Sequence, residues 1–286
     1  MKLTMESLFN LDRRVIFVFI FLAVLLPYLL KINLPITPNQ IVVNVHDKIE
    51  EVGKENGTVL VSFDFDPASK AELEPMARAI LHDLFKNNVK VVAMGHWVTG
   101  VDMARALLEE AAKEHNKEYG KDYTFLGWKA GAGMLIVNMG QDFHSAFPKD
   151  GDGKYDTTKM SVTKDITTIR DFDYIISLAA GGVGIDLWIM FAQAKYDMII
   201  GGGCTAVMAP DYYTYLQSGQ LNGLIGGMVG AAEYEKIIDR SGDARAGMTS
   251  QSVSHLILIF FIIFGNICYS IGQSRKKKID SLQEQR

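Results

Sequence analysis

Two long runs without a charged side chain lie near the ends of this 286-residue chain, and they constrain its fold more than any other feature. Residues 253–271 read VSHLILIFFIIFGNICYSI, and residues 15–30 read VIFVFIFLAVLLPYLL. A helix that crosses a bilayer needs about 20 largely apolar residues. The C-terminal run has that length, and the N-terminal run reaches it if the stem of Lys31 snorkels and the helix continues. We therefore expect transmembrane helices over residues 15–36 and 252–272.

Each run has one competing interpretation. The first is similar to a cleaved signal peptide, because Arg13 and Arg14 precede an apolar stretch. No cleavage site of small residues follows it, since the next residues are KINLPIT, and this favours an uncleaved anchor. The second run competes with a buried core helix, but it has no polar face and the basic cluster at 275–278 follows it. Both observations favour a membrane span.

Basic residues flank the two runs on their outer sides. Lys2, Arg13 and Arg14 precede the first run, and the cluster at 275–278 follows the second. Because cytoplasmic flanks carry the excess of lysine and arginine, both termini are predicted to be cytoplasmic. The sequence thus predicts an integral protein of the plasma (inner) membrane. Its predicted parts are a cytoplasmic N-terminus at 1–14, an extracytoplasmic domain at 37–250 and a basic cytoplasmic tail at 273–286.

Between the runs, apolar strand-like segments alternate with segments of helical periodicity. We expect strands at residues 58–65, 89–94, 123–128, 173–178, 197–200 and 221–225, with helices between and after them. A further short edge strand is expected at residues 41–45. Strands that alternate with helices of about 10–15 residues indicate βαβ units and a parallel sheet. We therefore predict a doubly wound α/β domain of Rossmann or flavodoxin-like type with a mostly parallel sheet.

The composition excludes several classes of protein. Charged residues make up 22%, which is close to the average of globular proteins and argues against wholesale disorder. Two cysteines exclude a disulfide scaffold, and no Cys-x-x-Cys pair or Cys/His run indicates a structural zinc site. The net charge of -4 argues against a general nucleic-acid-binding protein. We expect no cofactor.

Residues at the strand exits are the first candidates for chemistry, because open α/β sheets bind ligands at the carboxyl ends of their strands. Asp64 and Asp66 follow the first apolar strand. This arrangement resembles the first motif of haloacid-dehalogenase-type phosphohydrolases, which implies a carboxylate nucleophile and a general acid beside Mg²⁺. The chain departs from that family at Ala68 and has no acidic pair at a later strand exit. In the alternative interpretation one carboxylate caps the next helix, and Pro67 begins the turn.

Cys204 lies in the sequence GGCTA at the fifth strand exit, which is similar to the Gly-x-Ser-x-Gly of a nucleophile elbow. A thiol at the start of a helix has a lowered pKa, because the helix dipole favours the thiolate. Such a nucleophile also needs a base, for which His96 or His144 would have to lie nearby. In the alternative interpretation Cys204 is a small buried residue. The candidate catalytic residues, which form no complete set, are Asp64, Asp66, His96 and Cys204.

Two glycine-rich strand exits are candidates for binding an anionic group through main-chain N–H groups. Their candidate ligand-binding residues are Gly181, Gly182, Gly184, Gly202, Gly203 and Thr205. Neither run matches the dinucleotide-binding or P-loop pattern, so a nucleotide is not favoured. The loop with Asp150, Asp152 and Asp156 is similar to a calcium loop, and these three are candidate metal ligands. Because Lys154 and Tyr155 stand where an oxygen ligand and a glycine are needed, the alternative is an exposed turn.

Small residues indicate contact surfaces at two places. Glycines four residues apart lie in the sequence GQLNGLIGGMVGAA, which permits close packing of another backbone or of a partner subunit. Asn266 lies inside the C-terminal apolar run, where an unpaired amide is costly and often contacts a partner helix. The candidate interface residues are Gly223, Gly226, Gly227, Gly230 and Asn266. The alternatives are internal packing of the glycines and contact of Asn266 with the headgroup region.

Incomplete catalytic sets, two membrane anchors and small-residue patches favour a non-enzymatic component of a membrane protein complex. In this hypothesis the extracytoplasmic Rossmann-like domain binds other integral membrane subunits or further copies of itself, and the bilayer is the other partner. One alternative is an extracytoplasmic small-ligand-binding or sensor domain. The other is a membrane-anchored hydrolase that uses the residues at the strand ends. The sequence leaves enzyme activity open and favours its absence.

Overall fold

The computed structural model describes residues 12–30, 35–240 and 242–283. It divides into two compact units, one formed by Met1–Leu34 with Ala246–Arg286 and the other by Pro35–Arg245. Each unit is described by itself. Residues 1–11 of the predicted N-terminal segment and residues 31–34 of the predicted first span lie outside the described residues.

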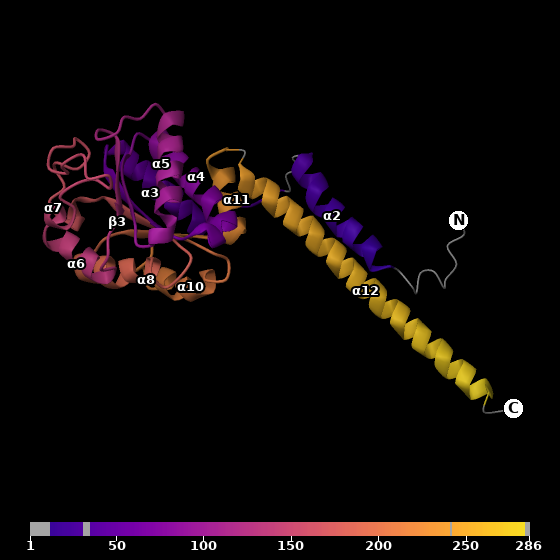
Figure 1. Cartoon of the computed structure of the whole chain (residues 1–286). Helices are drawn as coiled ribbons and strands as arrows, with labels where there is room; N and C mark the ends of the chain where they lie inside the picture. The colour runs from indigo at the N-terminus through magenta and orange to yellow at the C-terminus, as the bar shows by residue number, and fades with distance from the viewer. Residues whose placement is uncertain (1–11, 31–34, 241, 284–286) are drawn as a thin grey trace. The chain divides into compact units, whose positions relative to one another are not determined.

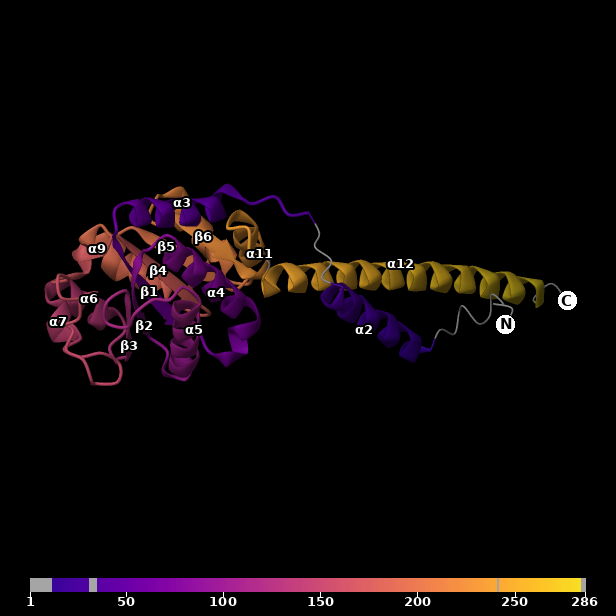
Figure 2. The ribbon, with the colours of Figure 1, turned by 90° about the horizontal axis from the view of Figure 1, so that it is seen from above.

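The larger unit is built on one six-stranded parallel sheet (Figures 1 and 2). Its strands are β1 (Thr58–Asp64), β2 (Lys90–Gly95), β3 (Tyr123–Trp128), β4 (Tyr174–Ala179), β5 (Ile200–Cys204) and β6 (Gly223–Gly226). They lie in the order β3-β2-β1-β4-β5-β6, and every neighbouring pair is parallel. This is the strand order of a doubly wound Rossmann sheet, so the predicted parallel α/β class is confirmed.

Helices cover both faces of the sheet (Figure 1). The helices on one face are α3 (Gln40–Lys54), α4 (Lys70–Lys86), α5 (Val101–Glu114) and α11 (Gly227–Ile237). Those on the other face are α6 (Gly133–Gln141), α7 (Phe143–Ala146), α8 (Ile185–Trp188), the π-helical η4 (Ile189–Gln193), α9 (Ala194–Tyr196) and α10 (Ala209–Gln217). Three 3₁₀ turns lie in the connections, η1 (Pro67–Ser69), η2 (Val98–Gly100) and η3 (Ile169–Asp171). Because both faces are covered, every residue of β1 and β4 is buried.

Asparagine residues turn the chain where the first three helices of this unit end. Asn56, Asn88 and Asn116 have φ angles of 53°, 58° and 53°, and they follow α3, α4 and α5. These angles belong to the left-handed region, which asparagine adopts more readily than most residues. The turn reverses the chain, so that β1 and β2 begin within a few residues of Asn56 and Asn88.

The segment at 41–45, which the sequence analysis assigns to an edge strand, is instead part of α3. That prediction is wrong because the local run of β-branched residues belongs to a longer helical pattern. The buried side chains of α3 are Val42, Val45, Ile49 and Val52, at the spacing of one helix face. Asn39 caps the helix, since its side chain accepts a hydrogen bond from the Ile41 N–H at 3.2 Å.

The smaller unit contains α2 (Arg13–Leu29) and most of α12 (Asp243–Gln283). Of the described helices, one is long and apolar enough to cross a membrane, over the 32 residues Asp243–Ser274, and its apolar window is not buried in the protein. The predicted span at 252–272 lies inside it. With 17 residues, α2 is about 26 Å long, which is less than a hydrocarbon core of about 30 Å. The predicted span at 15–36 therefore has no support from the described residues.

A buried polar network joins three helices of the larger unit. Asp83 of α4 is buried and accepts hydrogen bonds from His46 Nδ1 of α3, at 2.7 Å, and from the Tyr234 hydroxyl of α11, at 2.6 Å. The hydrogen bond to Asp83 raises the pKa of His46 above its ordinary value of 6.5, although partial burial opposes the rise. The charged imidazole is thus stabilised by folding.

Replacing His46 by glutamine is expected to remove a stabilisation that depends on pH. A group whose pKa is raised by folding contributes fully below its unfolded pKa of 6.5 and loses this contribution as pH rises through the folded pKa. The protein should therefore melt at a higher temperature than the His46→Gln variant at acidic pH, and the difference should shrink at alkaline pH. Circular dichroism melts on both sides of pH 6.5 measure this.

The matched control is His144→Gln, because His144 Nδ1 hydrogen-bonds the uncharged Thr157 at 2.9 Å. The difference in melting temperature between His144→Gln and the unsubstituted protein should vary less with pH than the difference for His46→Gln. If the loss of melting temperature in His46→Gln instead grows as pH rises, the charged imidazole of His46 is not stabilised by Asp83.

Candidate functional site

The carboxyl ends of β1 and β4 mark the topological switch point of the sheet. These strands are neighbours, but the connection after β1 leads to β2 on one side and the connection after β4 leads to β5 on the other. In open α/β sheets this point is where ligands bind. The residues that the structure brings there are Asp64, His96, Ser177 and the glycine-rich connection at 180–184.

Asp64 is fully buried and is the polar centre of this point. Its Oδ1 accepts hydrogen bonds from the Ser62 hydroxyl at 2.8 Å and from the His96 main-chain N–H at 2.9 Å. Its Oδ2 accepts from the Ser177 hydroxyl at 2.9 Å and from Trp188 Nε1 at 3.4 Å. One carboxyl group thus joins β1, the exit of β2, β4 and α8. The four donors together occupy the lone pairs of the Asp64 carboxylate. The role of Asp64 is therefore to hold these four elements together.

Asp66 has a different environment from Asp64. It is the N-cap of η1, where its Oδ1 accepts a hydrogen bond from the Ala68 N–H at 3.0 Å. Pro67 follows at the first position of the turn. Asp66 therefore has the capping role of the alternative interpretation, in which one of the two carboxylates caps the next helical turn. The two carboxyl groups bind different partners, and these contacts give no support to the phosphohydrolase-like mechanism.

His96 has the most unusual environment among the predicted residues. Its side chain is 8% exposed, and both ring nitrogens are buried without a hydrogen-bond partner among the described residues. The ring lies against Trp188, with centroids 5.4 Å apart. Its carbonyl accepts a hydrogen bond from Trp128 Nε1 at 3.0 Å. A buried polar group without a partner costs about 1–3 kcal/mol, so a group that supplies the hydrogen bond would be stabilising.

The glycines after β4 divide into two kinds. A Cβ on Gly181 would lie 2.9 Å from the Trp97 ring, and a Cβ on Gly184 would lie 3.3 Å from Cβ of Asp64. Trp97 also donates a hydrogen bond from Nε1 to the Val183 carbonyl at 2.8 Å, which holds the connection in place. Gly182 has no atom of the described residues within 4 Å of its Cβ position. Gly181 and Gly184 therefore serve close packing, and Gly182 is the open position.

The glycines of β5 have packing roles. A Cβ on Gly202 would lie 2.9 Å from Ile185, and a Cβ on Gly203 would overlap Met76. In the turn after Thr205, the Ala206 N–H donates a hydrogen bond to Glu72 Oε2 at 2.8 Å. A carboxylate of this chain thus binds the N–H group of the residue after Thr205, at one of the two glycine-rich segments predicted to bind an anionic group.

Cys204 is fully buried at the end of β5. It pairs with Ala179, which in turn pairs with Asp64, so Cys204 and Asp64 are two strand spacings, about 10 Å, apart. Burial raises the pKa of the Cys204 thiol to about 12, and the charges of Glu72 and Asp211 add to the rise. The geometry therefore supports the small-buried-residue interpretation and not a nucleophile.

In the folded chain Cys204 is expected to resist alkylation by iodoacetamide. With a thiol pKa of about 12, almost no Cys204 is a thiolate at neutral pH, and the thiol is also shielded from the reagent. A Cys268→Ser variant leaves Cys204 as the single thiol for mass spectrometry. The same variant in denaturant is the control and should react fully. Rapid labelling of the folded variant would restore the nucleophile hypothesis.

The three predicted metal ligands of the loop after α7 have separate partners. Asp150 is buried and accepts hydrogen bonds from the Tyr119 hydroxyl at 2.8 Å and from two main-chain N–H groups. Asp152 forms an ion pair with Arg105 at 2.7 Å. Asp156 pairs with Lys159, also at 2.7 Å. The structure thus shows a turn held by hydrogen bonds, and it does not bring the three carboxylates together on one ion.

The four predicted interface glycines all meet neighbours inside the larger unit. A Cβ on Gly223 would lie 2.7 Å from the Ile41 carbonyl oxygen, and one on Gly227 would lie 2.6 Å from Ala206. A Cβ added to Gly226 would lie 3.0 Å from Ala209, and one added to Gly230 would lie 3.0 Å from Ile225. In α12, Asn266 Nδ2 donates to the Ile262 carbonyl at 2.9 Å, one turn earlier. The geometry favours internal packing for the glycines and a local partner for Asn266.

One feature of the carboxyl edge was missed by the sequence analysis. Exposed apolar side chains follow four successive strands at this edge, and we call them the carboxyl-edge rim. They are Val98 after β2, Trp128 and Met134 at and after β3, Val183 after β4 and Val207 after β5. Val207 is 86% exposed. The signal in the sequence was an apolar residue at or soon after four of the predicted strand ends, where a polar loop is usual.

Comparisons of this chain with protein-family models, with curated proteins and with solved structures found no match.

Proposed function

We propose that this chain is a non-enzymatic, membrane-anchored component of a membrane protein complex, and that the carboxyl-edge rim contacts its partner. In this proposal α12 anchors the chain in the plasma (inner) membrane. The domain at 37–250 is extracytoplasmic and both termini are cytoplasmic, as the basic flanks at Arg13, Arg14 and 275–278 favour. The partner is another integral membrane subunit or a further copy of the chain.

The observation that carries the proposal is the carboxyl-edge rim. Five apolar side chains at or after the ends of β2, β3, β4 and β5 are 39–86% exposed, all at the carboxyl edge of one sheet. Several exposed apolar side chains at one edge of a domain mark a contact site more often than a single one does. A partner that covers the rim removes this apolar surface from water, which is the main source of association free energy.

The contacts of the candidate catalytic residues also favour a non-enzymatic role. Asp64 accepts four hydrogen bonds, Asp66 caps η1, and Cys204 is buried with a raised thiol pKa. A nucleophile or a general base must be free to meet a substrate. These three groups are occupied or shielded, so binding is favoured over hydrolysis.

Site-specific photo-cross-linking of the full chain in its own membrane tests the proposal. A photoreactive residue replaces Val98 or Val207 of the rim, and in the control it replaces Glu55, which is exposed at the amino end of β1. We expect a discrete cross-linked product from the two rim positions and none from Glu55. The absence of rim products, or equal products from all three positions, would refute the contact.

The unpartnered ring of His96 favours a second candidate, a small-ligand-binding domain. A ligand at the switch point with one hydrogen-bonding group would satisfy a nitrogen of this ring. Thermal-shift screening of small polar molecules against the protein and a His96→Phe variant tests this. A molecule that stabilises the protein and not the variant supports ligand binding. A Val207→Ser variant is the control, because it should leave such a shift unchanged while weakening the partner contact.

A further inference from the structure

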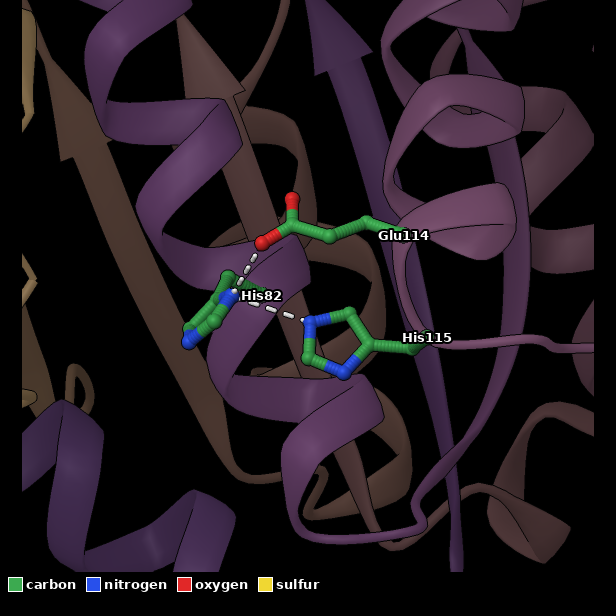
Figure 3. Close-up of side chains that lie close together, drawn as sticks. All are labelled: His82, Glu114 and His115. Carbon is green, nitrogen blue, oxygen red and sulfur yellow. Dashed lines mark hydrogen bonds and ion pairs between the residues drawn. The ribbon is translucent and has the colours of Figure 1, made fainter.

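Three side chains of metal-ligating type meet where two helices end, away from the carboxyl-edge rim (Figure 3). His82 lies near the end of α4, Glu114 is the last residue of α5, and His115 follows it. Because α4 and α5 connect parallel strands, both run back to the amino ends of those strands. The cluster is thus at the opposite edge of the sheet from the switch point.

The ligand atoms of the cluster lie at distances that suit a shared ion. His82 Nδ1 is 3.2 Å from Glu114 Oε1 and 2.9 Å from His115 Nε2. All three ligand atoms lie within 4.8 Å of one another. Zinc binds imidazole nitrogen and carboxylate oxygen at about 2.0–2.2 Å, so an ion between these atoms needs only small side-chain adjustments.

Hydrogen bonds alone leave this arrangement poorly satisfied. A neutral imidazole has one N–H and one lone pair, and a carboxylate has lone pairs only. His82 Nδ1 faces both Glu114 Oε1 and His115 Nε2, so a single hydrogen on Nδ1 would be divided between two acceptors. If Nδ1 instead accepts from His115, its lone pair faces the Glu114 carboxylate. A cation satisfies all three atoms at once.

The surroundings keep these groups in the form that binds a metal. Burial lowers the pKa of His82 and of His115, and the charge of Arg240 lowers both further, so neutral imidazoles are favoured. Although burial opposes it, Arg240 also lowers the pKa of Glu114, whose Oε2 it binds at 3.0 Å. This ion pair orients the carboxylate and leaves Oε1 beside His82 Nδ1.

We propose that His82, Glu114 and His115 form a binding site for one divalent transition-metal ion of the zinc type. Two imidazoles and one carboxylate are a ligand set that zinc adopts with water in the fourth position. The last carbonyl groups of two helices also favour a cation there. The bound ion joins α4 to α5, so it stabilises the folded domain. This inference is independent of the proposed partner contact.

Zinc titration of the full chain in mild detergent tests the site. The protein carries no polyhistidine tag, is stripped with a chelator, and is then titrated with Zn²⁺ by calorimetry, with elemental analysis of bound zinc. We expect one zinc per chain, a higher melting temperature with zinc, and a visible Co²⁺ spectrum of tetrahedral type. Glu114→Gln and His115→Ala should each weaken binding at least about tenfold.

Two control variants separate ligation from folding and charge. Glu109→Gln changes an exposed carboxylate on the same helix and should bind zinc as the protein does. Arg240→Gln removes the ion pair to Glu114 but keeps the three ligands, and it should retain one zinc per chain. The Glu114 side chain is 44% exposed, so Glu114→Gln is expected to fold. Substoichiometric zinc in the protein, or equal affinity in Glu114→Gln, would overturn the assignment.

Discussion

Replacing Asp64 by alanine is expected to lower the free energy of unfolding by about 3–5 kcal/mol, the largest loss from a single substitution predicted for this chain. The change removes the common acceptor of four buried donors, from Ser62, His96, Ser177 and Trp188. Each donor then remains buried without a partner. Asp64→Asn keeps the shape but turns an NH₂ group toward donors, so it should also be strongly destabilising.

The matched control is Asp66→Ala, two residues further along. Asp66 caps a short exposed turn, so its loss should cost about 1 kcal/mol. Urea unfolding followed by tryptophan fluorescence measures both variants, because Trp97, Trp128 and Trp188 all lie near the switch point. Equal losses from the two variants would show that Asp64 is not the structural centre of the switch point.

Replacing Gly201 by alanine is expected to cost about 2–3 kcal/mol through overpacking. A Cβ at this position would overlap the Tyr174 hydroxyl and lie 2.6 Å from its Cζ atom. Tyr174 is fully buried and its hydroxyl donates to Asn222 Oδ1 at 3.2 Å, so the ring has little room to move. The added methyl group must therefore displace a strand or the ring.

Gly182→Ala is the control for Gly201→Ala, because a Cβ there meets no atom of the described residues within 4 Å. Its effect on the free energy of unfolding should stay within about 0.5 kcal/mol. In a Tyr174→Phe background, part of the cost of Gly201→Ala should disappear, since one overlapping atom is gone. If Gly201→Ala lowers the free energy of unfolding equally in that background, the strain does not come from the Tyr174 hydroxyl.

The sheet could be predicted from the sequence because its signals are local. Strands β1 to β4 are short, largely apolar runs, and the asparagines near the helix ends mark the reversals. The prediction of 197–200 for the fifth strand was wrong, because β5 spans Ile200–Cys204 and its three glycines gave no strand signal. The helix α3 was missed because a five-residue window at 41–45 is too short to show its period, which needs Ile49 and Val52 as well. The N-terminal span was predicted from hydropathy, whereas α2 ends after 17 residues.

The switch point could be located from topology, but its contacts could not. The rule for parallel sheets selects Asp64 and His96, since both follow strands. Ser177 and Trp188, which bind Asp64, lie 113 and 124 residues away in the sequence. The zinc-type cluster was missed for the same reason: His82 and Glu114 belong to different helices 32 residues apart, and no sequence spacing encodes how those helices pack.

The hydrogen bond from the Ala206 N–H to Glu72 Oε2 has a consequence for any anionic ligand. Glu72 is an internal competitor, present at the turn after β5 at a high effective concentration because it is tethered to the same chain. A free phosphate or carboxylate binds there only in the fraction of molecules in which Glu72 has moved away, so its apparent affinity falls by that fraction. The Ala206 N–H group is thus used to link the turn after β5 to α4, and not to bind a free anion.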